Sequence, residues 1–356
     1  MNTDLPARTC CPADAAPVSA AGGSGLPLRV DSEWTLGDHL GALGVRLNIR
    51  RTSYSVSPGL YALGMPGPDA PVFVSANYKL SFDHLRRALA GMNAWILVLD
   101  TRGVNVWCAA GKGTFGTVEL VRQIGECRLQ ERVAHRRLLL PQLGAPGVAA
   151  HEVRKQTGFA VGYGPVRAAD IPEFLQAGLQ ATPAMRRVRF PWHERLAVAP
   201  LELVLAFKPI LLLGLALAVL AGVPAGGSFP SALWHRGGPV FALSLLTCGL
   251  AGLLGPLLLP WLPTRAFSIK GACLGVALAA VGLWLGGPDW TVLRRAAWVL
   301  LAAAGTSHLL LNFTGSTTFT SPSGVRREVR AAIPAQIAVG ALGLAAWATA
   351  GFLPKW

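Results

Sequence analysis

One cysteine stands out because its neighbours would leave its sulfur accessible. Cys108 lies in residues 105–112, NVWCAAGK, between a tryptophan and three small residues. If a helix begins here, the thiol lies at the positive end of the helix dipole, and Lys112 follows one turn later. Both favour the thiolate, the form of cysteine that attacks electrophiles or binds metals, and the small side chains would let a flat, bulky partner approach. A free cysteine can equally be an inert buried residue, and this alternative stays open.

The residues after Cys108 come close to two phosphate-binding motifs. The P-loop motif fails because Val106 stands where its first glycine belongs, and Gly113 stands where serine or threonine must follow the lysine. The pattern GxGxxG does occur, as GKGTFG starting at Gly111. In a dinucleotide-binding fold, however, that pattern follows its strand directly, and here NVWCAA intervenes. An NAD-dependent dehydrogenase is therefore the less favoured alternative.

Short apolar runs in the N-terminal half are typical of buried strands. They cover residues 71–74, 95–99, 104–107, 138–140 and 159–161. Helical patterns fall between them, and the clearest is SFDHLRRAL, which Ser81 would cap. The alternation predicts an α/β domain over residues 31–189. Because ligands in open α/β sheets bind beyond the carboxyl ends of the strands, the segment NVWC at such an end is well placed for a site.

The C-terminal half has the composition of a membrane domain. The chain of 356 residues is 52% hydrophobic and only 14% charged, which is too apolar for two soluble domains. We expect a juxtamembrane linker over residues 190–200 and an all-α transmembrane domain over residues 201–356, whose uncharged stretches can each supply the roughly 20 apolar residues of a spanning helix. The five predicted spans are residues 203–222, 240–259, 267–286, 294–312 and 333–353.

Five spans would place the two termini on opposite sides of the membrane. The Lys and Arg residues beside the spans number ten on the side of the N-terminal domain and four on the other side. The positive-inside rule then makes the N-terminal domain cytoplasmic and puts the C-terminus across the inner membrane. Much of the net charge of +14 follows from this topology, so a nucleic-acid partner is not expected.

The cysteine pattern argues against further metal sites. Among the six cysteines there is no CxxC pair, so zinc and iron–sulfur sites within the chain are not expected. A cytoplasmic domain also disfavours disulfides. Residues 1–30, rich in Ala, Pro, Gly and Ser, are expected to be a disordered tail. Cys10 and Cys11 in this tail could bind a soft metal ion, although a chance pair in a flexible segment is the favoured interpretation.

Longer segments around Cys108 carry a resemblance to one protein family. They are VSANYKLSFDHLRRAL, NAWILVLDTRGVNVWC, NVWCAAGKGTFGT and LLLPQLGAPGVAAHEVRKQTGFAVGYGPVRAADIPEFL, joined near the C-terminus by LNFTGSTTFTSPSGVRREVR. They resemble the mercury-methylation corrinoid proteins, which are related to the large subunit of the corrinoid iron–sulfur protein. The resemblance implies a Rossmann-like corrinoid-binding domain ahead of the transmembrane domain. The iron–sulfur relative differs from this chain because it carries a four-cysteine cluster region and no membrane domain.

The resemblance also implies roles for single residues. The matching cysteine of the family is the lower axial ligand of cobalt in a cobamide whose own base is displaced, so Cys108 would be that ligand. A cap helix under the corrin ring would consist of Cys108 with Asn105, Val106, Trp107, Ala109, Ala110, Gly111 and Lys112. Further contacts are expected where glycine lets the backbone approach a cofactor closely. These residues are Thr114, Gly144, Ala145, Pro146 and Gly147.

The implied activity is cobamide-dependent transfer of a methyl group from cobalt to Hg(II), which gives methylmercury. A thiolate below the cobalt suits this reaction, because transfer to an electrophile leaves Co(III), which a strongly donating ligand stabilises. The implied partners are a small ferredoxin with two 4Fe–4S clusters as reductant, a methyltetrahydrofolate-type methyl donor, Hg(II) and the membrane. A corrinoid methyl carrier of one-carbon metabolism, whose acceptor is not mercury, is the alternative.

Overall fold

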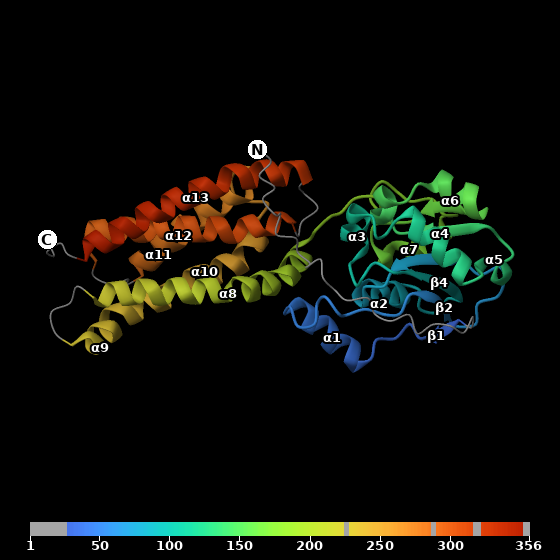
Figure 1. Ribbon diagram of the computed structural model, residues 1–356, viewed down its shortest axis with the longest axis horizontal. Helices are drawn as coiled ribbons and strands as arrows, with labels where there is room; N and C mark the ends of the chain where they lie inside the picture. The colour runs from blue at the N-terminus through green and yellow to red at the C-terminus, as the bar shows by residue number, and fades with distance from the viewer. Residues whose placement is uncertain (1–26, 224–227, 286–289, 316–321, 352–356) are drawn as a thin grey trace. The chain divides into compact units, whose positions relative to one another are not determined.

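The computed structural model describes residues 27–223, 228–285, 290–315 and 322–351 (Figure 1). The chain divides into two compact units, the first of residues 1–45 and 49–189 and the second of residues 46–48 and 190–356. Most of the expected tail, with Cys10 and Cys11, lies outside the described residues. Its last three residues were assigned wrongly, because Leu28–Val30 form strand β1 and pair with the next strand of the sheet.

The first unit is built on one mixed sheet of six strands, in the order β1-β2-β4-β3-β5-β6 (Figure 1). Strands β2 and β4 are antiparallel, and the other neighbouring pairs are parallel. The strands after β1 are β2 (Gly59–Leu63), β3 (Val72–Ala76), β4 (Ala94–Leu99), β5 (Arg137–Leu140) and β6 (Ala160–Tyr163). Every residue of β3 and β4 is buried, as expected for central strands covered on both faces.

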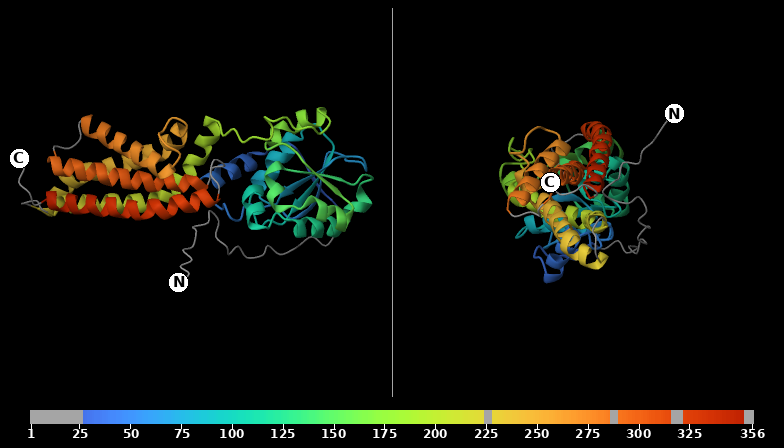
Figure 2. Two further views of the ribbon diagram at one scale, coloured as in Figure 1. Left: turned by 90° about the horizontal axis from the view of Figure 1, so that it is seen from above. Right: turned by 90° about the vertical axis from the view of Figure 1, so that its left-hand side faces the viewer.

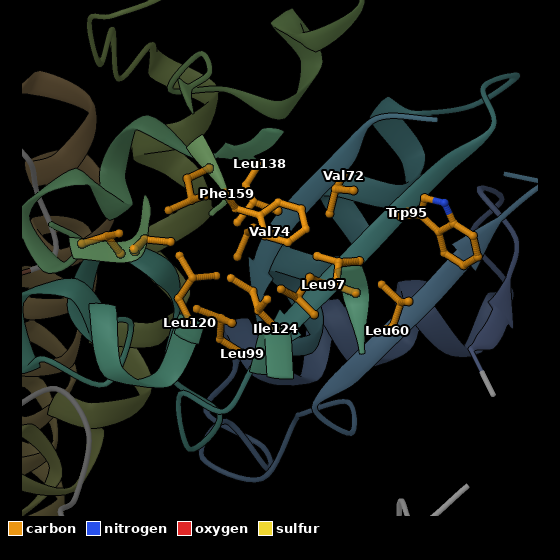
Figure 3. Close-up of a cluster of buried hydrophobic side chains, with 14 of the residues drawn as sticks. Leu60, Val72, Val74, Trp95, Leu97, Leu99, Leu120, Ile124, Leu138 and Phe159 are labelled. Atoms are coloured by element: carbon orange, nitrogen blue, oxygen red, sulfur yellow. The ribbon is translucent and has the colours of Figure 1, made fainter. Parts of the chain in front are cut away.

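Helices cover both faces of this sheet. On one face, α4 (Thr117–Glu126) packs on the strands through Leu120 and Ile124 (Figure 3). On the same face, α6 (Ala150–Thr157) contributes Val153. On the other face, α2 (Lys79–Ala88) and α7 (Ile171–Gln176) contribute apolar side chains such as Phe82 and Phe174. The remaining helices of the unit are α1 (Leu36–Arg46), α3 (Val106–Lys112), α5 (Leu129–Arg132) and the 3-10 turns η1 (Gln142–Gly147) and η2 (Ala168–Asp170). The predicted α/β class is confirmed.

Two local predictions for this unit were wrong. The apolar run 104–107 is not a strand, because β4 ends at Leu99 and α3 begins at Val106. Helix α2 begins at Lys79, before the expected cap Ser81, and Tyr78 stands at the cap position without a side-chain hydrogen bond. The Lys79 ammonium instead pairs with two carboxylates, which stabilises the earlier start of the helix.

The chain reverses its direction of travel across the sheet between β3 and β5. From β3 it passes through α2 to β4, whereas from β5 it passes through α6 to β6, on the opposite side. Because β3 and β5 are parallel neighbours, their carboxyl ends flank a topological switch point. Such points are where open α/β sheets bind ligands.

The second unit is helical (Figure 2). Its helices are α8 (Trp192–Gly222), α9 (Phe229–Ala232), the π-helical turn η3 (Leu233–Gly237), α10 (Gly238–Leu258), α11 (Phe267–Trp284), α12 (Val292–Asn312), the 3-10 turn η4 (Phe313–Gly315) and α13 (Pro322–Ala350). Residues 192–200, expected to belong to a linker, are the first turns of α8.

Four helical stretches in the described part of the chain are long and apolar enough to cross a membrane, not the five expected. They are Trp192–Gly222, Phe229–Leu258, Phe267–Trp284 and Ser323–Ala350. The predicted span 294–312 does form helix α12, of 21 residues. Its two arginines at the start and its polar residues near the end, among them Thr306 and His308, make its composition too polar to qualify. The orientation inferred from an odd number of spans remains a prediction.

Helix α12 is nevertheless packed closely within this unit. The Thr306 hydroxyl donates to the carbonyl oxygen of Gly271 on α11, with an oxygen–oxygen distance of 2.8 Å. A Cβ atom on Gly271 or Gly275 would collide with the backbone of α12. On the other side, Gln336 of α13 donates to the Ser307 hydroxyl at 2.9 Å. Small residues and interhelical hydrogen bonds of this kind hold helices together in membranes.

Candidate functional site

Helix α3 places Cys108 in its first turn. Asn105 is the N-cap residue, and its side-chain oxygen accepts a hydrogen bond from the backbone N–H of Cys108 at 3.0 Å. Gly113 ends the helix in the left-handed conformation, with a φ of 80°. Cys108 is half-buried, whereas Lys112 in the last turn is exposed. The helix start suggested by the sequence is therefore present, one residue after Asn105.

A second asparagine, Asn77, holds the loop that leads into this helix. Asn77 is buried just beyond the carboxyl end of β3. Its Oδ1 atom accepts hydrogen bonds from the N–H and the hydroxyl of Thr101, at 3.1 and 2.8 Å, and from the N–H of Gly103 at 2.9 Å. Its Nδ2 atom donates to Asp100 at 3.1 Å. One side chain thus fixes residues 100–103, directly before the cap of α3.

A cavity of about 310 Å³ lies at the switch point. Its wall combines the end of β3, one side of α2, the start of α3, the end of β5 and the segment after β6. The lining residues are Phe73, Val74, Ser75, Ser81, His84, Leu85, Asn105, Val106, Trp107, Leu139, Leu140, Pro141, Leu143, Gly164, Pro165, Val166, Ala168, Ile171 and Phe174. The wall is mainly apolar with a few polar groups, the usual character of a site for an organic ligand. Three of the predicted site residues, Asn105, Val106 and Trp107, line it directly.

The three small residues after Cys108 lie on two sides of α3. Ala109 and Ala110 are buried in the core of the unit, with 0% and 6% of their surface exposed. These two methyl groups therefore face the core of the unit. Only Gly111 of the three lies on the exposed side of α3, where a Cβ atom would meet nothing within 4 Å.

The glycines of η1 also act in packing. A Cβ on Gly147 would collide with the Phe115 carbonyl oxygen and make a tight contact with Ala110 of α3, and one on Gly144 would lie 2.5 Å from the Phe115 ring. The absence of side chains here lets η1 lie against α3 and Phe115. Contact with a cofactor was the reason for selecting these glycines, and that contact remains a prediction; the structure shows that they also support α3 from behind. Of their neighbours, Pro146 is exposed, whereas Ala145 and Thr114 are half-buried.

A buried ion-pair cluster fixes helix α2, which forms one wall of the cavity. Asp38 of α1 pairs with Lys79 and Arg86 of α2 at 2.5 and 2.7 Å, and both cations also pair with Asp83. Burial alone would raise the pKa of Asp38, but hydrogen bonds from Lys79, Thr35 and Arg86 outweigh it and hold that pKa well below its usual range. The cluster was not foreseen, although the spacing of Lys79 and Asp83, one helical turn apart, was visible.

The protein supplies few metal ligands of its own here. Among the described residues, no group of three or more His, Cys, Asp and Glu side chains could hold a metal ion. A metal bound to Cys108 would therefore have to bring most of its ligands with it.

Comparison with known proteins finds a match over the unit that carries this site. Residues 40–175 match the family described as the CO dehydrogenase/acetyl-CoA synthase delta subunit. The gamma subunit of the acetyl-CoA decarbonylase/synthase complex of Archaeoglobus fulgidus is 35% identical over 128 residues, and that of Methanopyrus kandleri is 34% identical over 129 residues. Each alignment covers 35% of this chain and 27% of the relative. The chain thus matches about a quarter of the length of these curated relatives.

Proposed function

We propose that this protein is a membrane-anchored, cobamide-dependent methyltransferase in which Cys108 is the lower ligand of cobalt. The observation that carries the proposal is the position of Cys108 in the first turn of α3, whose preceding residues line the cavity at the switch point. The similarity to subunits of acetyl-CoA decarbonylase/synthase complexes supports the coarser part, membership of a corrinoid methyl-transfer group.

The residues present fit such a cofactor. A corrin ring brings four nitrogen ligands to its cobalt, so one thiolate would be the ligand that the protein has to add. This fits the described residues, in which no group of three or more His, Cys, Asp and Glu side chains could hold a metal ion. The cavity is at the small end of the range for ligand sites. It would therefore hold a part of the cofactor rather than the whole, and its apolar wall suits the displaced base. Asn105, Val106 and Trp107 would contact that part.

The chain's own residues would mainly position the sulfur. When bound, the cofactor would supply the transferable methyl group. Asn105 holds the backbone of Cys108, and Asn77 holds the loop before it. Ala109, Ala110 and Gly147 support the inner side of the helix. The partial positive charge of the helix start and the ammonium of Lys112 both favour a negatively charged sulfur.

We propose Hg(II) as the methyl acceptor, on the resemblance of the segments around Cys108 to the mercury-methylation corrinoid proteins. A membrane anchor is supported by the four apolar helices beyond residue 191, which lie outside the matched residues 40–175. In this proposal the first unit is cytoplasmic, a small ferredoxin with two 4Fe–4S clusters is the reductant, and a methyltetrahydrofolate-type system supplies the methyl group. The alternative acceptor is a component of one-carbon metabolism, and the named relatives favour it.

The test is to purify the full chain, load it with cobamide and record its absorption spectrum. Cys108→Ala should alter the cobalt absorption bands and abolish methylmercury formation in the presence of the reductant. Neither Cys108 nor Cys127 lines the cavity itself, and both are half-buried. Cys127→Ala is the matched control, because Cys127 ends α4 and does not belong to α3, the helix whose first residues line the cavity. Unchanged spectra and full activity in Cys108→Ala would contradict the ligand assignment.

A second measurement separates the two acceptors. Wild-type chain that binds cobamide and methylates Hg(II) supports the first proposal. If the wild-type protein binds methylated cobamide but passes the methyl group to a component of one-carbon metabolism and not to Hg(II), the alternative is supported. Cys108→His should retain part of the cobamide binding and lose most of the methylation, because a neutral imidazole donates less electron density than a thiolate.

A further inference from the structure

Helix α1 exposes a stripe of leucines. Leu36, Leu40 and Leu43 are 75%, 59% and 52% exposed, and their spacing of four and three residues puts them on one side of the helix. The opposite side is fixed to the domain by the buried residues Asp38, Ala42 and Val45. Ile49, just beyond the helix, is also 59% exposed. These four side chains are called the α1 stripe below.

The exposed large hydrophobic side chains of this part of the chain are gathered in the α1 stripe. Among the described residues 27–189, the other large hydrophobic side chains of high exposure are Leu28, Met65 and Val118. Leu28 lies in β1, Met65 in the turn after β2 and Val118 in α4, so these three are separate from one another along the chain. A single exposed apolar residue is ordinary, whereas several gathered on one helix mark a contact surface.

Basic residues accompany the stripe. Arg46 and Arg50 are exposed, Arg51 is half-buried, and the sequence from His39 to Arg51 contains no acidic residue. The loop also holds Asn48 and Arg50 in the left-handed conformation, with φ of 62° and 52°. Apolar and cationic side chains together complement an anionic lipid surface. A symmetric contact between two copies would instead bring these arginines toward one another.

We propose that the α1 stripe and Arg46 and Arg50 bind the surface of an anionic bilayer. The leucines and Ile49 would enter the boundary between headgroups and acyl chains, and the arginines would contact lipid phosphates. This inference rests on the proposal that the apolar helices cross a membrane. If α8 crosses the membrane, the first unit is tethered close to the bilayer, because it ends at Arg189 and α8 begins at Trp192.

Contact of α1 with lipid would affect how the proposed site is oriented. The ion pairs from Asp38 to Lys79 and Arg86 join α1 to α2, and α2 lines the cavity through Ser81 and His84. A bilayer contact at α1 would therefore restrict the orientations in which the cavity can meet a partner. It would do so without a lipid touching the cavity.

Photocross-linking in nanodiscs tests this inference on the full chain. Leu40 is replaced by the photoreactive residue p-benzoylphenylalanine, and the protein is reconstituted with an equal mixture of phosphatidylcholine and phosphatidylglycerol. Mass spectrometry after irradiation should find a lipid adduct at position 40. The same residue placed at Val118 or Met65, which are 83% and 80% exposed, should give none.

A cross-linker at Leu212 on α8, which is 66% exposed, separates the two proposals. Lipid adducts at position 212 without any at position 40 would overturn the α1 inference and leave the membrane helices standing. Absence at both positions would overturn both. Adducts from position 40 to a second copy of the chain would also overturn the inference.

A separate experiment tests the contribution of Arg46 and Arg50. Arg46→Glu with Arg50→Glu should reduce the yield of the lipid adduct at position 40 several-fold in these discs. Discs of pure phosphatidylcholine should reduce that yield to a similar extent for the protein that keeps both arginines. Arg154→Glu with Lys155→Glu makes the same charge change on exposed residues of α6 and should leave the yield as it was. An unchanged yield in Arg46→Glu/Arg50→Glu would overturn the assignment to an anionic surface.

Discussion

The side-chain oxygen of Asn105 accepts a hydrogen bond from the backbone N–H of Cys108 at 3.0 Å, so the residue that begins helix α3 also fixes the residue that carries the thiol. The two residues belong to one turn of a helix of seven residues. A helix this short depends strongly on its cap, because few of its backbone N–H groups have partners within the helix.

Asn105→Ala should therefore loosen α3. Removal of an asparagine cap typically costs about 1 kcal/mol, and hydrogen exchange of the amides in residues 106–112 should become faster. Asn105→Ser keeps an oxygen that can accept the same hydrogen bond and should restore slow exchange. Equal exchange in the alanine and serine variants would show that the cap does not hold the helix.

Asn77→Ala should disorder the loop before α3 and weaken the proposed cofactor binding. The change removes the acceptor of three hydrogen bonds from Thr101 and Gly103. The Thr101 hydroxyl keeps the Val104 carbonyl as an acceptor, but the buried N–H of Thr101 is left unpaired, which costs about 1–3 kcal/mol. Limited proteolysis within residues 100–105 and a cobamide titration measure the two effects. Gln123→Ala, another buried amide but outside this loop, should leave both unchanged.

Replacement by alanine should change the stability of the protein in opposite directions at two glycines on opposite sides of α3. Gly147→Ala places a methyl group against the Phe115 carbonyl, and overpacking of this kind typically costs about 1–3 kcal/mol. Gly111→Ala meets open space and should stabilise the helix by about 0.5–1 kcal/mol. Thermal unfolding of the purified chain should show a lower unfolding temperature for the first variant only. If Gly111→Ala folds normally yet loses cobamide binding, the exposed side of α3 contacts the cofactor.

The stability of the first unit should depend on the ionisation of Asp38. Because its pKa in the folded protein is held below the value of about 3.9 in an unfolded chain, its stabilising effect is present above that pH and is lost as the pH falls through the folded pKa. Asp38→Asn removes one of the two carboxylate partners of Arg86, which keeps its ion pair with Asp83, and loss of a charged hydrogen-bond partner of this kind costs about 1.5–3 kcal/mol at neutral pH. The gap in unfolding temperature between wild type and variant should shrink in acid.

A control for the acid experiment is available on α4. Glu126 pairs with Arg122 at 2.6 Å, but its side chain is 54% exposed. Glu126→Gln should change the free energy of unfolding by less than about 1 kcal/mol at any pH. A loss as large as that of Asp38→Asn would show that burial does not distinguish the two pairs.

Four strands could be predicted from local pattern, because each is a short continuous apolar run, although only β3 and β4 are buried along their whole length and the edge strand β6 is partly exposed. The runs at 71–74, 95–99, 138–140 and 159–161 correspond to β3, β4, β5 and β6. The run at 104–107 has the same composition and is divided between a loop and a helix, since the cap Asn105 sets the helix start. Strand β2 was missed, although its sequence GLYAL is also apolar.

The site could be predicted only in its local part. The thiol, the small residues beside it and Lys112 are neighbours in sequence, so a helix start was enough to relate them. Asn77 could not be found in this way, because its hydrogen-bonding partners lie 23 to 26 residues further along the chain. The same holds for Gly147, whose reason for being glycine is a contact with Phe115 and Ala110.

The sequence by itself determined which segments are apolar and where charged residues accumulate, and it indicated that Cys108 lies near the start of a helix. These properties depend on residues close together in the chain. The tertiary structure decided that β3 and β5 are neighbours, that a cavity opens at their carboxyl ends beside Asn105, and that the glycines of η1 support α3. The physical reason is that strand order and packing depend on contacts between distant segments. Local hydrophobic pattern makes each segment able to pack, but it does not specify which partner the segment meets.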